Sequence, residues 1–343
     1  MTLHVAIPDK FTRPFYHYLT SELKLEGQQF LFLGNPTQEW ANAQNVQWIH
    51  TPIKNQLFQN LNRFFSLTRK ADRIVLHGDA LIVFFALFPW ILKKTAWVIY
   101  GQELYGLHGN NSFFTRLRKW VYRQVGCHIT HIEGDSKLAN QMLKSNAKWL
   151  YSPMYLSNVT TTNDFAPQDM TTKNGLKIMV GNSTDPANNH QNIFEMILPY
   201  QDQIDQIYCP LSYGSYEDYK KKITAIGKDY FAEKFVVIDQ FMDFETYKKF
   251  INQMDVVIFD HHRQEAMGVT LTLLSLGKII YMNPHTTSFE SLTYRGFQVF
   301  DNQLIAQHGL KVNREVTKNK ACLEKYYSHE VFNQSWKQIS QQS

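Results

Sequence analysis

The sequence contains few cysteines and no apolar stretch long enough to cross a bilayer. Its three cysteines, Cys127, Cys209 and Cys322, are far apart and show no CxxC spacing. This pattern predicts neither a disulfide framework nor a zinc site, and it fits a reducing compartment. The most apolar stretch, residues 80–92, has 13 residues and contains Pro89. Because a spanning helix needs about 20 apolar residues, we expect a buried helix here and no transmembrane segment.

The first residues lack the features of a secretory signal. A strand-like run starts at Leu3, and no basic segment precedes a long apolar one, so we expect no signal peptide. The chain has 343 residues with 44% hydrophobic and 19% charged residues. These values are typical of a folded globular protein with room for two domains.

Acidic residues are scarce in the first half of the chain. Residues 1–150 carry 17 Lys and Arg against 9 Asp and Glu, a net charge of +8. Residues 151–343 carry 18 against 21, a net charge of −3. The basic half is therefore suited to an anionic partner, and nucleic acid or an anionic membrane would both meet that description.

Strand-like and helix-like segments alternate along the whole chain, which favours parallel sheets covered by helices. Strands are predicted at residues 3–8, 29–34, 72–80, 97–101, 127–135, 176–182, 206–214, 234–241, 255–260, 278–283 and 297–300. A polar, turn-rich stretch separates the two series. The predicted organisation is a first domain over residues 1–158, a linker over 159–175, a second domain over 176–320, and a last helical stretch over 321–343 that packs back across the cleft. Ligands of such sheets lie beyond the carboxyl ends of the strands, so we expect the site between the two domains.

The first strand-to-helix turn of the second domain is suited to a phosphate group. An apolar strand ends at Gly181, and a helix is predicted to begin near Pro186. Unpaired amides and the dipole at a helix start favour an anion, and a glycine permits close backbone approach. Three polar side chains there are further hydrogen-bond candidates: Asn182, Ser183 and Asn188. Alternatively, Ser183 or Asp185 is simply a helix cap.

A second turn, within residues 255–283, carries charged side chains. Arg263 lies just past a predicted strand end and is suited to a diphosphate leaving group. Gln264 and Glu265 follow it, and Glu265 is suited to accept hydrogen bonds from sugar hydroxyls. The neighbouring His261 and His262 point in opposite directions on an extended chain, so we expect no metal site.

Several segments together resemble glycosyltransferase family 56, in the order of that family. They are residues 97–105, 132–136, 181–190, 209–214 and 263–268. The family contains the TDP-N-acetylfucosamine:lipid II N-acetylfucosaminyltransferases of enterobacterial common antigen synthesis. Glu265 and Gly268 also resemble the acidic residue and the glycine at a helix start in GT-B enzymes. A second Glu eight residues on commonly holds ribose hydroxyls there. Here that position is Leu273, which is compatible with a deoxyribose donor such as dTDP.

The resemblance implies a fold and a reaction. The fold is α/β of the GT-B type, with two Rossmann-like parallel-sheet domains facing a cleft. The reaction is an inverting, metal-independent transfer of an amino deoxysugar (4-acetamido-4,6-dideoxygalactose type) from dTDP to a polyprenyl-diphosphate-linked glycan, without a cofactor. We expect the donor to contact Gly181, Asn182, Ser183, Asn188, His190, Tyr213, Gln240, Phe241, Arg263, Gln264, Glu265 and Gly268. Two alternatives stay open: a glycosyltransferase of another surface polysaccharide with a different nucleotide sugar, or a non-catalytic protein that binds a nucleotide sugar or nucleic acid.

An inverting transfer needs a base for the proton of the attacking hydroxyl, and a carboxylate serves. Glu103 is the first candidate because it follows a strand within a family-like segment, and Asp79 is the second. Asp135 is the third and also an acceptor-binding candidate, together with His77 and Gly101. Each carboxylate has an alternative as a helix cap or as the partner of a nearby Arg.

Two stretches, residues 58–73 and 113–123, combine aromatic, leucine and basic residues. In the second, an apolar helical face opposes a basic one, a pattern typical of helices in the interface of an anionic bilayer. The membrane-facing candidates are Arg116, Lys119, Trp120 and Arg123. Alternatively, the apolar face covers the domain's own sheet. With a lipid-linked acceptor, we expect a peripheral protein on the cytoplasmic face of the bacterial inner membrane.

Overall fold

The computed structural model describes residues 1–343 except 41–42, 110–111, 168–174, 311–314 and 342–343. The chain forms two compact units. Unit 1 comprises Met1–Val159 together with His329–Ser343, and unit 2 comprises Thr160–Ser328. The last segment of the chain therefore belongs to the same unit as the first. Part of the predicted linker, residues 168–174, lies outside the described residues.

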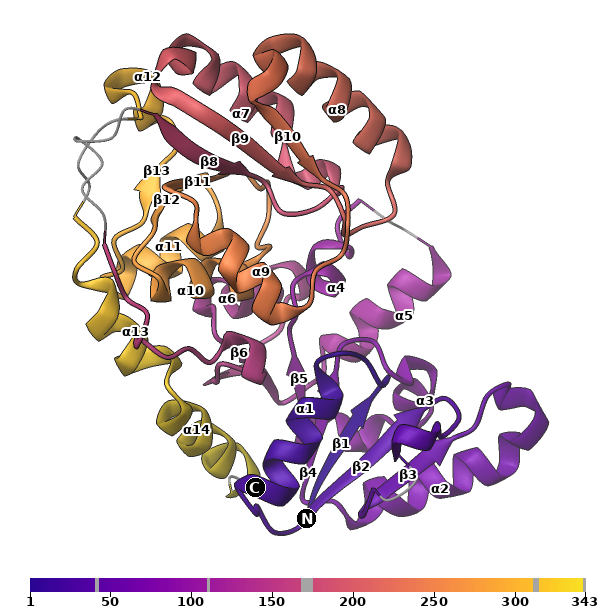
Figure 1. Ribbon diagram of the computed structural model, residues 1–343. Coiled ribbons are helices and arrows are strands. Elements are labelled where there is room, and N and C mark those ends of the chain that lie inside the picture. The colour runs from indigo at the N-terminus through magenta and orange to yellow at the C-terminus, as the bar shows by residue number, and fades with distance from the viewer. Residues whose placement is uncertain (41–42, 110–111, 168–174, 311–314, 342–343) are drawn as a thin grey trace. The chain divides into compact units, whose positions relative to one another are not determined.

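Unit 1 is built on a seven-stranded parallel sheet with the order β3-β2-β1-β4-β5-β6-β7 (Figure 1). Its strands are β1 (Thr2–Ala6), β2 (Gln28–Leu33), β3 (Val46–Ile49), β4 (Arg73–His77), β5 (Thr95–Val98), β6 (Cys127–Thr130) and β7 (Lys148–Tyr151). Its helices are α1 (Thr12–His17), η1 (Tyr18–Glu22), η2 (Gln38–Trp40), η3 (Ile53–Gln56), α2 (Leu57–Lys70), α3 (Ile82–Leu87), η4 (Pro89–Lys94), α4 (Gln102–Tyr105), α5 (Phe113–Tyr122), α6 (Glu133–Leu143), η5 (Leu156–Asn158) and α14 (His329–Gln341). The chain first adds β2 and β3 on one side of β1 and then adds β4 to β7 on its other side. Because the crossover connections are right-handed, this reversal places helices on both faces of the sheet.

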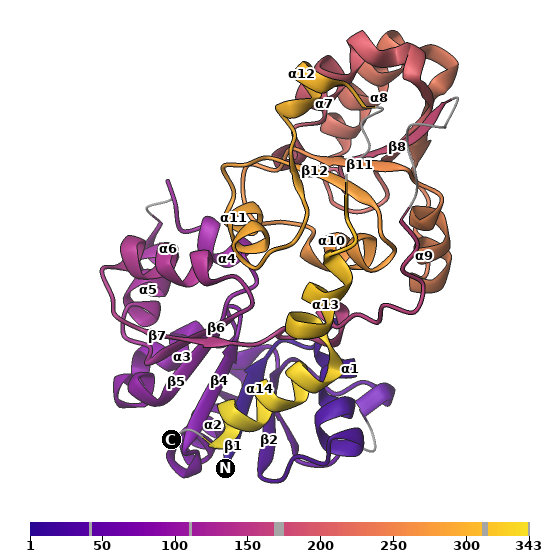
Figure 2. The same cartoon turned by 90° about the vertical axis from the view of Figure 1, so that its left-hand side faces the viewer.

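Each face of this sheet has its own apolar core because successive strand residues alternate in direction. Leu3, Val5 and Trp97 face the layer of α2, α3, α5 and α6. Residues of the opposite parity, such as Phe30, pack against α1, η1 and α14. Trp336 of α14 is completely buried on that second face. Figure 2 shows the helix α14 against unit 1. Burial of its apolar side chains fixes α14 to unit 1.

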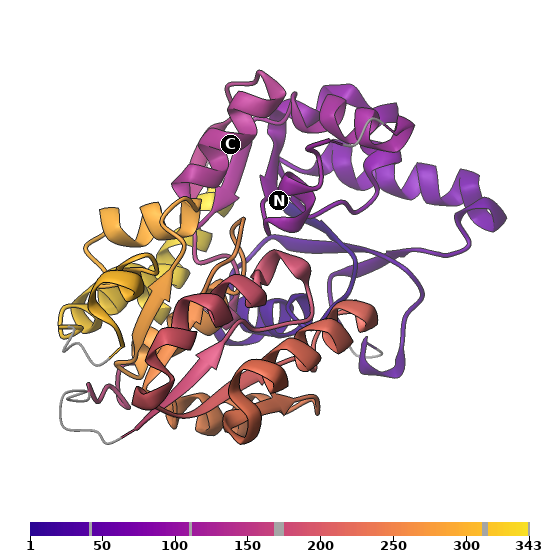
Figure 3. The ribbon, with the colours of Figure 1, turned by 90° about the horizontal axis from the view of Figure 1, so that it is seen from above.

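Unit 2 is built on a six-stranded parallel sheet with the order β10-β9-β8-β11-β12-β13. Its strands are β8 (Leu176–Val180), β9 (Ile204–Pro210), β10 (Phe235–Ile238), β11 (Val256–Phe259), β12 (Ile279–Met282) and β13 (Phe300–Asp301). Its helices are η6 (Pro186–Asn188), α7 (His190–Ile197), η7 (Leu198–Gln203), α8 (Glu217–Phe231), η8 (Ala232–Lys234), α9 (Phe244–Asn252), α10 (Met267–Ser275), α11 (Thr287–Tyr294), α12 (Leu304–His308) and α13 (Asn319–Tyr327). Figure 3 shows α7 and α8 together on one side of this sheet. Because β8 and β11 are neighbours at the reversal of strand order, the loops after them lie side by side.

Three predictions about individual elements were wrong in detail. The α-helix predicted to begin near Pro186 begins at His190, after the short turn η6. The last helical stretch is two helices, α13 and α14, divided at Ser328. The apolar stretch at residues 80–92 forms α3 and η4, and three of its large side chains, Val83, Leu87 and Trp90, are exposed rather than buried.

No helix within the described ranges combines the length and the apolar composition that a membrane-spanning segment requires.

Candidate active site

The loop after β8 is held in place by the side chain of Asn188. This side chain is completely buried. Its Oδ1 accepts the backbone N–H of Asn182 at 2.8 Å, and its Nδ2 donates to Ser183 Oγ at 3.0 Å and to Asp185 O at 3.1 Å. Asn188 therefore shapes the loop from beneath, which differs from the direct ligand contact expected from the sequence.

Two buried histidines support the same loop. His261 Nε2 lies 2.9 Å from Asn182 Oδ1 and 3.2 Å from Asn188 Oδ1. Both oxygens are acceptors, so this nitrogen carries the proton. Burial lowers the pKa of His261 to about 3, as it does for His190, so both rings are neutral at pH 7. His190 is completely enclosed beneath Gly181 and supports the loop rather than contacting a ligand.

Gly181 is required where it stands. Its φ is +64°, and an added Cβ would collide with the His190 ring, which has Cδ2 at 2.8 Å. We expect Gly181→Ala to lower the free energy of unfolding by about 2–4 kcal/mol, because left-handed strain adds to the clash. Urea unfolding of the purified protein measures this, with Gly109→Ala as the control. Gly109 also has positive φ, at +70°, but nothing lies within 4 Å of its added Cβ. Equal losses in the two variants would contradict the close packing.

Arg263, at the turn after β11, is anchored between two carboxylates. Its Nη2 lies 2.6 Å from Asp185 Oδ2, and its Nε lies 3.5 Å from Glu265 Oε2. Asp185 also accepts the N–H of Ala187 at 2.8 Å, so the predicted cap at this residue is present. No local pattern indicates that Asp185 also positions Arg263, because the two residues are 78 positions apart.

Two side-chain oxygens in this turn are buried and have no hydrogen-bond partner among the described residues: Gln264 Oε1 and Glu265 Oε2. The ion pair of Glu265 with Arg263 is too long to be a hydrogen bond. Leaving a buried acceptor unpaired costs roughly 1–3 kcal/mol. Burial, followed by the charge of Asp185, raises the pKa of Glu265. Such acceptors are typical of a site that a ligand with N–H or O–H groups completes.

The N-terminus of α10 lies beside Arg263 in the sequence and provides unpaired amides. Its N-cap residue, Ala266, has φ +57°, and its side chain cannot cap the helix. The first-turn N–H groups and the helix dipole therefore favour an anion next to a guanidinium. Gly268 lies in this first turn and permits close approach.

Behind this turn, Asp260 forms a structural cluster that the sequence analysis missed. Its carboxylate accepts from Asn189 at 2.5 Å, from Asn192 at 2.6 Å and from Asn302 at 2.8 Å. Asp260 is 4% exposed. Three amide donors satisfy the buried charge and tie β11 to α7 and to the segment after β13. No local pattern marks such a cluster, because its members are far apart in the chain.

The residues expected to contact the base lie at the same carboxyl edge of the sheet. Tyr213 follows β9, and Gln240 and Phe241 follow the neighbouring strand β10. All three side chains are exposed, Phe241 at 78%. The backbone O of Tyr213 accepts the N–H of Thr184 at 2.7 Å, which joins this edge to the loop after β8.

Among the described residues, no group of three or more His, Cys, Asp and Glu side chains has metal-binding geometry.

In unit 1, Glu103 lies in α4, just past β5, and is 8% exposed. Its Oε1 accepts the backbone N–H of Tyr100 at 2.6 Å, as a helix-capping carboxylate does. Burial raises the pKa of Glu103 to about 8. A carboxyl group with this pKa exchanges its proton near neutral pH, which is the property of a general base or acid.

The other carboxylates of this edge have structural partners. Asp79 forms an ion pair with Arg118 at 2.9 Å and accepts from Tyr122. Asp135 is 1% exposed and accepts from the hydroxyl of Tyr105 at 2.9 Å. Asp79 therefore has the alternative role considered for these carboxylates, that of a partner of a nearby Arg.

His77 is buried within a chain of hydrogen bonds rather than open to an acceptor. It lies 3.0 Å from His4 Nδ1 and bonds to Tyr155, whose hydroxyl contacts that of Tyr100. Burial, followed by the nearby His4, keeps the pKa of His77 well below its usual value. Gly101 has φ +115° and forms the turn that leads into α4. Both residues shape the edge on which Glu103 lies.

The two parallel-sheet units have the GT-B fold, in agreement with three solved structures. HepE of Anabaena in complex with UDP and glucose has 12% identity, 98% coverage of both chains and a TM-score of 0.71. The lipopolysaccharide outer core galactosyltransferase WaaB has 10% identity, 99% coverage of both and a TM-score of 0.70. An E. coli structure described as trehalose-6-phosphate bound with UDP-2-fluoro glucose has 11% identity, 100% coverage of both and a TM-score of 0.64. At these identities the likeness concerns the fold.

The particular family follows from the sequence itself. The model of the 4-alpha-L-fucosyltransferase family, glycosyl transferase group 56, matches residues 9–342. The chain belongs to this family and is a glycosyltransferase. The family resemblance and the GT-B fold expected from the sequence are confirmed.

Proposed function

We propose that the protein transfers an amino deoxysugar from dTDP to a polyprenyl-diphosphate-linked glycan, with inversion and without a metal. The acceptor would belong to the synthesis of a bacterial surface polysaccharide of the enterobacterial common antigen type, at the cytoplasmic face of the inner membrane. The observation that carries the donor site is the turn after β11. It combines Arg263, the uncapped start of α10 and two buried acceptors that have no hydrogen-bond partner among the described residues, Gln264 Oε1 and Glu265 Oε2.

In this proposal, the diphosphate binds to backbone amides and to Arg263. The loop of Gly181, Asn182 and Ser183 supplies one wall, and the first turn of α10 supplies the other. A guanidinium paired to a diphosphate oxygen stabilises the charge that develops on the leaving group. Asp185 holds Arg263 at 2.6 Å before the donor arrives, so little side-chain ordering is left for binding.

Gln264 Oε1 and Glu265 Oε2 would read the transferred sugar. Both are acceptors, so they match N–H and O–H groups on the ligand. The amide N–H of an acetamido sugar and a neighbouring hydroxyl supply these donors. A site built to hydrogen-bond such groups discriminates against sugars that lack them, because its buried acceptors would remain unpaired.

The identity of residue 273, a leucine, is the reason for proposing dTDP as the nucleotide. This residue is completely buried in α10, so the position offers no carboxylate for ribose hydroxyls. A donor without a 2′-hydroxyl loses less there than a ribonucleotide donor does. Glu103 would remove the proton of the attacking acceptor hydroxyl as the new glycosidic bond forms and dTDP leaves.

Thermal unfolding with dTDP, UDP and GDP tests the donor class. A ligand at about one hundred times its dissociation constant adds roughly 2.7 kcal/mol to the free energy of unfolding. We therefore expect dTDP to raise Tm by several degrees, and by more than UDP or GDP at equal concentration. Stronger stabilisation by UDP or GDP would favour a glycosyltransferase with another nucleotide sugar. Absence of stabilisation by all three would contradict the proposed donor site.

A further inference from the structure

One helical layer of unit 1 exposes an unusual number of apolar side chains. The layer consists of α2, α3, η4 and α5, and we call it the basic layer. In Figures 1 and 2, α2, α3 and α5 lie one beneath another along one flank of the unit. Its large exposed side chains are Leu57, Phe58, Val83, Leu87, Trp90, Phe113, Phe114 and Trp120. Phe58 is 86% exposed and Phe113 is 74% exposed. Several large exposed apolar side chains on one layer are typical of an interaction surface.

The charges of this layer have one sign. The four helices contain eight Lys and Arg residues and no Asp or Glu. The basic residues are Arg63, Arg69, Lys70, Lys93, Lys94, Arg116, Arg118 and Lys119. Arg118 is engaged by Asp79, whereas Arg69, Lys70, Lys93 and Arg116 are exposed. An anionic partner therefore matches the layer.

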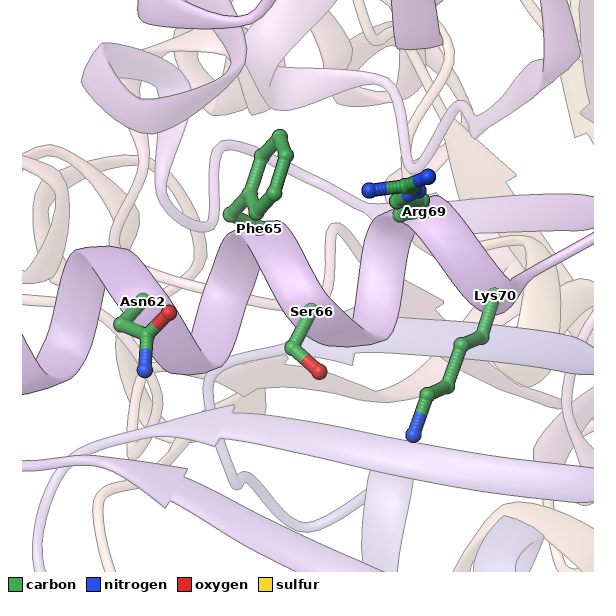
Figure 4. Close-up of a pocket in the computed structure, with 5 residues that line it drawn as sticks. All are labelled: Asn62, Phe65, Ser66, Arg69 and Lys70. Atoms are coloured by element: carbon green, nitrogen blue, oxygen red, sulfur yellow. The ribbon is translucent and has the colours of Figure 1, made fainter.

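Aromatic contacts join α2 to η4 within the layer. Phe65 of α2 packs against Phe88 and Trp90, with ring centroids 5.7 and 6.4 Å apart. A hollow on α2 lies beside this contact (Figure 4). It is lined by Asn62, Phe65, Ser66, Arg69 and Lys70. All five residues lie on successive turns of one helix, so the hollow is an open feature of the surface.

We propose that the basic layer docks the protein on an anionic lipid bilayer, with the aromatic and aliphatic side chains in the interface and the basic side chains near the lipid phosphates. The proposal deepens the proposed function and rests on its lipid-linked acceptor. Trp, Phe and Leu beside Lys and Arg are the composition of interfacial membrane helices. Each basic residue near an anionic surface contributes about one factor of five in binding.

Two other occupants fit the layer less well. A second copy of this chain on the same face would oppose eight basic residues to eight more, and like charges repel. Nucleic acid would satisfy the charges but would leave Leu57, Val83 and Leu87 without apolar contacts. A bilayer satisfies both the charge and the apolar exposure.

Sedimentation with lipid vesicles tests the proposal. The full-length protein is mixed with vesicles of phosphatidylcholine alone or of phosphatidylcholine with phosphatidylglycerol. We expect it to bind the anionic vesicles and to be released by raised salt. The double variants Phe113→Ser/Trp120→Ser and Arg116→Glu/Lys119→Glu should each lower the bound fraction, with a partition coefficient reduced about tenfold or more. Leu87→Ser/Trp90→Ser tests the η4 side of the layer and should act in the same direction.

Matched controls come from unit 2. Tyr294→Ser removes an aromatic side chain that is 85% exposed, and Lys221→Glu/Lys222→Glu reverses two exposed charges of α8. Both should bind vesicles like the parent protein. Failure of the parent protein to bind anionic vesicles, equal loss in the controls, or lipid-free dimers that the layer variants abolish would overturn the proposal. Stabilisation by dTDP in each variant reports the donor site separately, so failure of one proposal is distinguishable from failure of the other.

Discussion

Glu103→Gln should bind dTDP like the parent protein but lose nearly all turnover. Glutamine retains an oxygen for the N–H of Tyr100, which Glu103 Oε1 accepts at 2.6 Å, so the turn into α4 should persist. It cannot accept a proton at neutral pH. A positioned base typically accelerates a reaction 10²–10⁴-fold. We therefore expect kcat to decrease by a factor within that range. Steady-state transfer to a lipid-diphosphate acceptor measures the loss.

The raised pKa of Glu103 also predicts how kcat/KM and the free energy of unfolding change with pH. The pKa of folded Glu103 is about 8, above its ordinary value of 4.5. A base acts in its ionised form, so kcat/KM should rise with pH and level off above about 8. The folded protein retains this proton between pH 4.5 and 8, whereas the unfolded chain loses it. The contribution of Glu103 to the free energy of unfolding therefore falls with rising pH across this window, by up to about 1.4 kcal/mol per pH unit.

Comparison with two variants isolates this contribution. Glu103→Gln should lose this pH dependence and become progressively more stable than the parent protein as pH rises toward 8. Glu133→Gln is the control, because Glu133 is on the surface of α6 and pairs with Lys137 at 3.0 Å. It should change neither turnover nor the pH profile. Near-normal kcat in Glu103→Gln would remove Glu103 from the mechanism and leave its role as a cap.

Arg263→Ala should weaken dTDP binding by about a hundredfold, or roughly 3 kcal/mol. The guanidinium is the cation that the proposal places on the diphosphate, and its removal also leaves Asp185 without the partner at 2.6 Å. Two negative groups, Asp185 and Glu265, would then face an anionic ligand. Isothermal titration with dTDP, and the Tm shift at fixed dTDP, both measure the effect.

Two matched variants separate charge from geometry at this position. Arg263→Lys keeps the charge but loses the planar fork, so an intermediate loss is expected. Asp185→Asn keeps an acceptor for the N–H of Ala187 but loses the ion pair that holds Arg263, so dTDP affinity should fall, by less than in Arg263→Ala. Parent-like dTDP affinity in Arg263→Ala would show that the diphosphate binds elsewhere.

The candidate site is a case in which the sequence located the loops but not the role of each side chain. A strand followed by a glycine and polar residues is a local pattern, and it correctly marked the turns after β8 and β11. Asn188 and His190 were expected to touch the donor, yet they are completely buried and hold the loop from beneath. Whether a side chain of the loop is buried depends on residues from other segments of the chain, such as His261. A short stretch of sequence around Asn188 does not include these residues.

The same limit explains the surface of unit 1. The apolar residues 80–92 read as a buried helix because composition alone does not reveal which side of a helix meets the sheet. In the structure, Phe85 is completely buried, whereas Val83 and Leu87 of the same helix are exposed. The six-residue length of α3 allows only one narrow face toward the core.

The sequence by itself determined the class of architecture, the family and the positions of the two turns that we propose bind the diphosphate, because strand period, turn residues and family motifs are local properties of the chain. Tertiary structure alone decided that α14 completes unit 1, that Asp185 holds Arg263, and that two buried acceptors in the turn after β11 have no hydrogen-bond partner among the described residues. It also decided which apolar residues remain at the surface. These features arise from contacts between residues tens to hundreds of positions apart, and burial and hydrogen-bond pairing are set by those contacts rather than by neighbours in sequence.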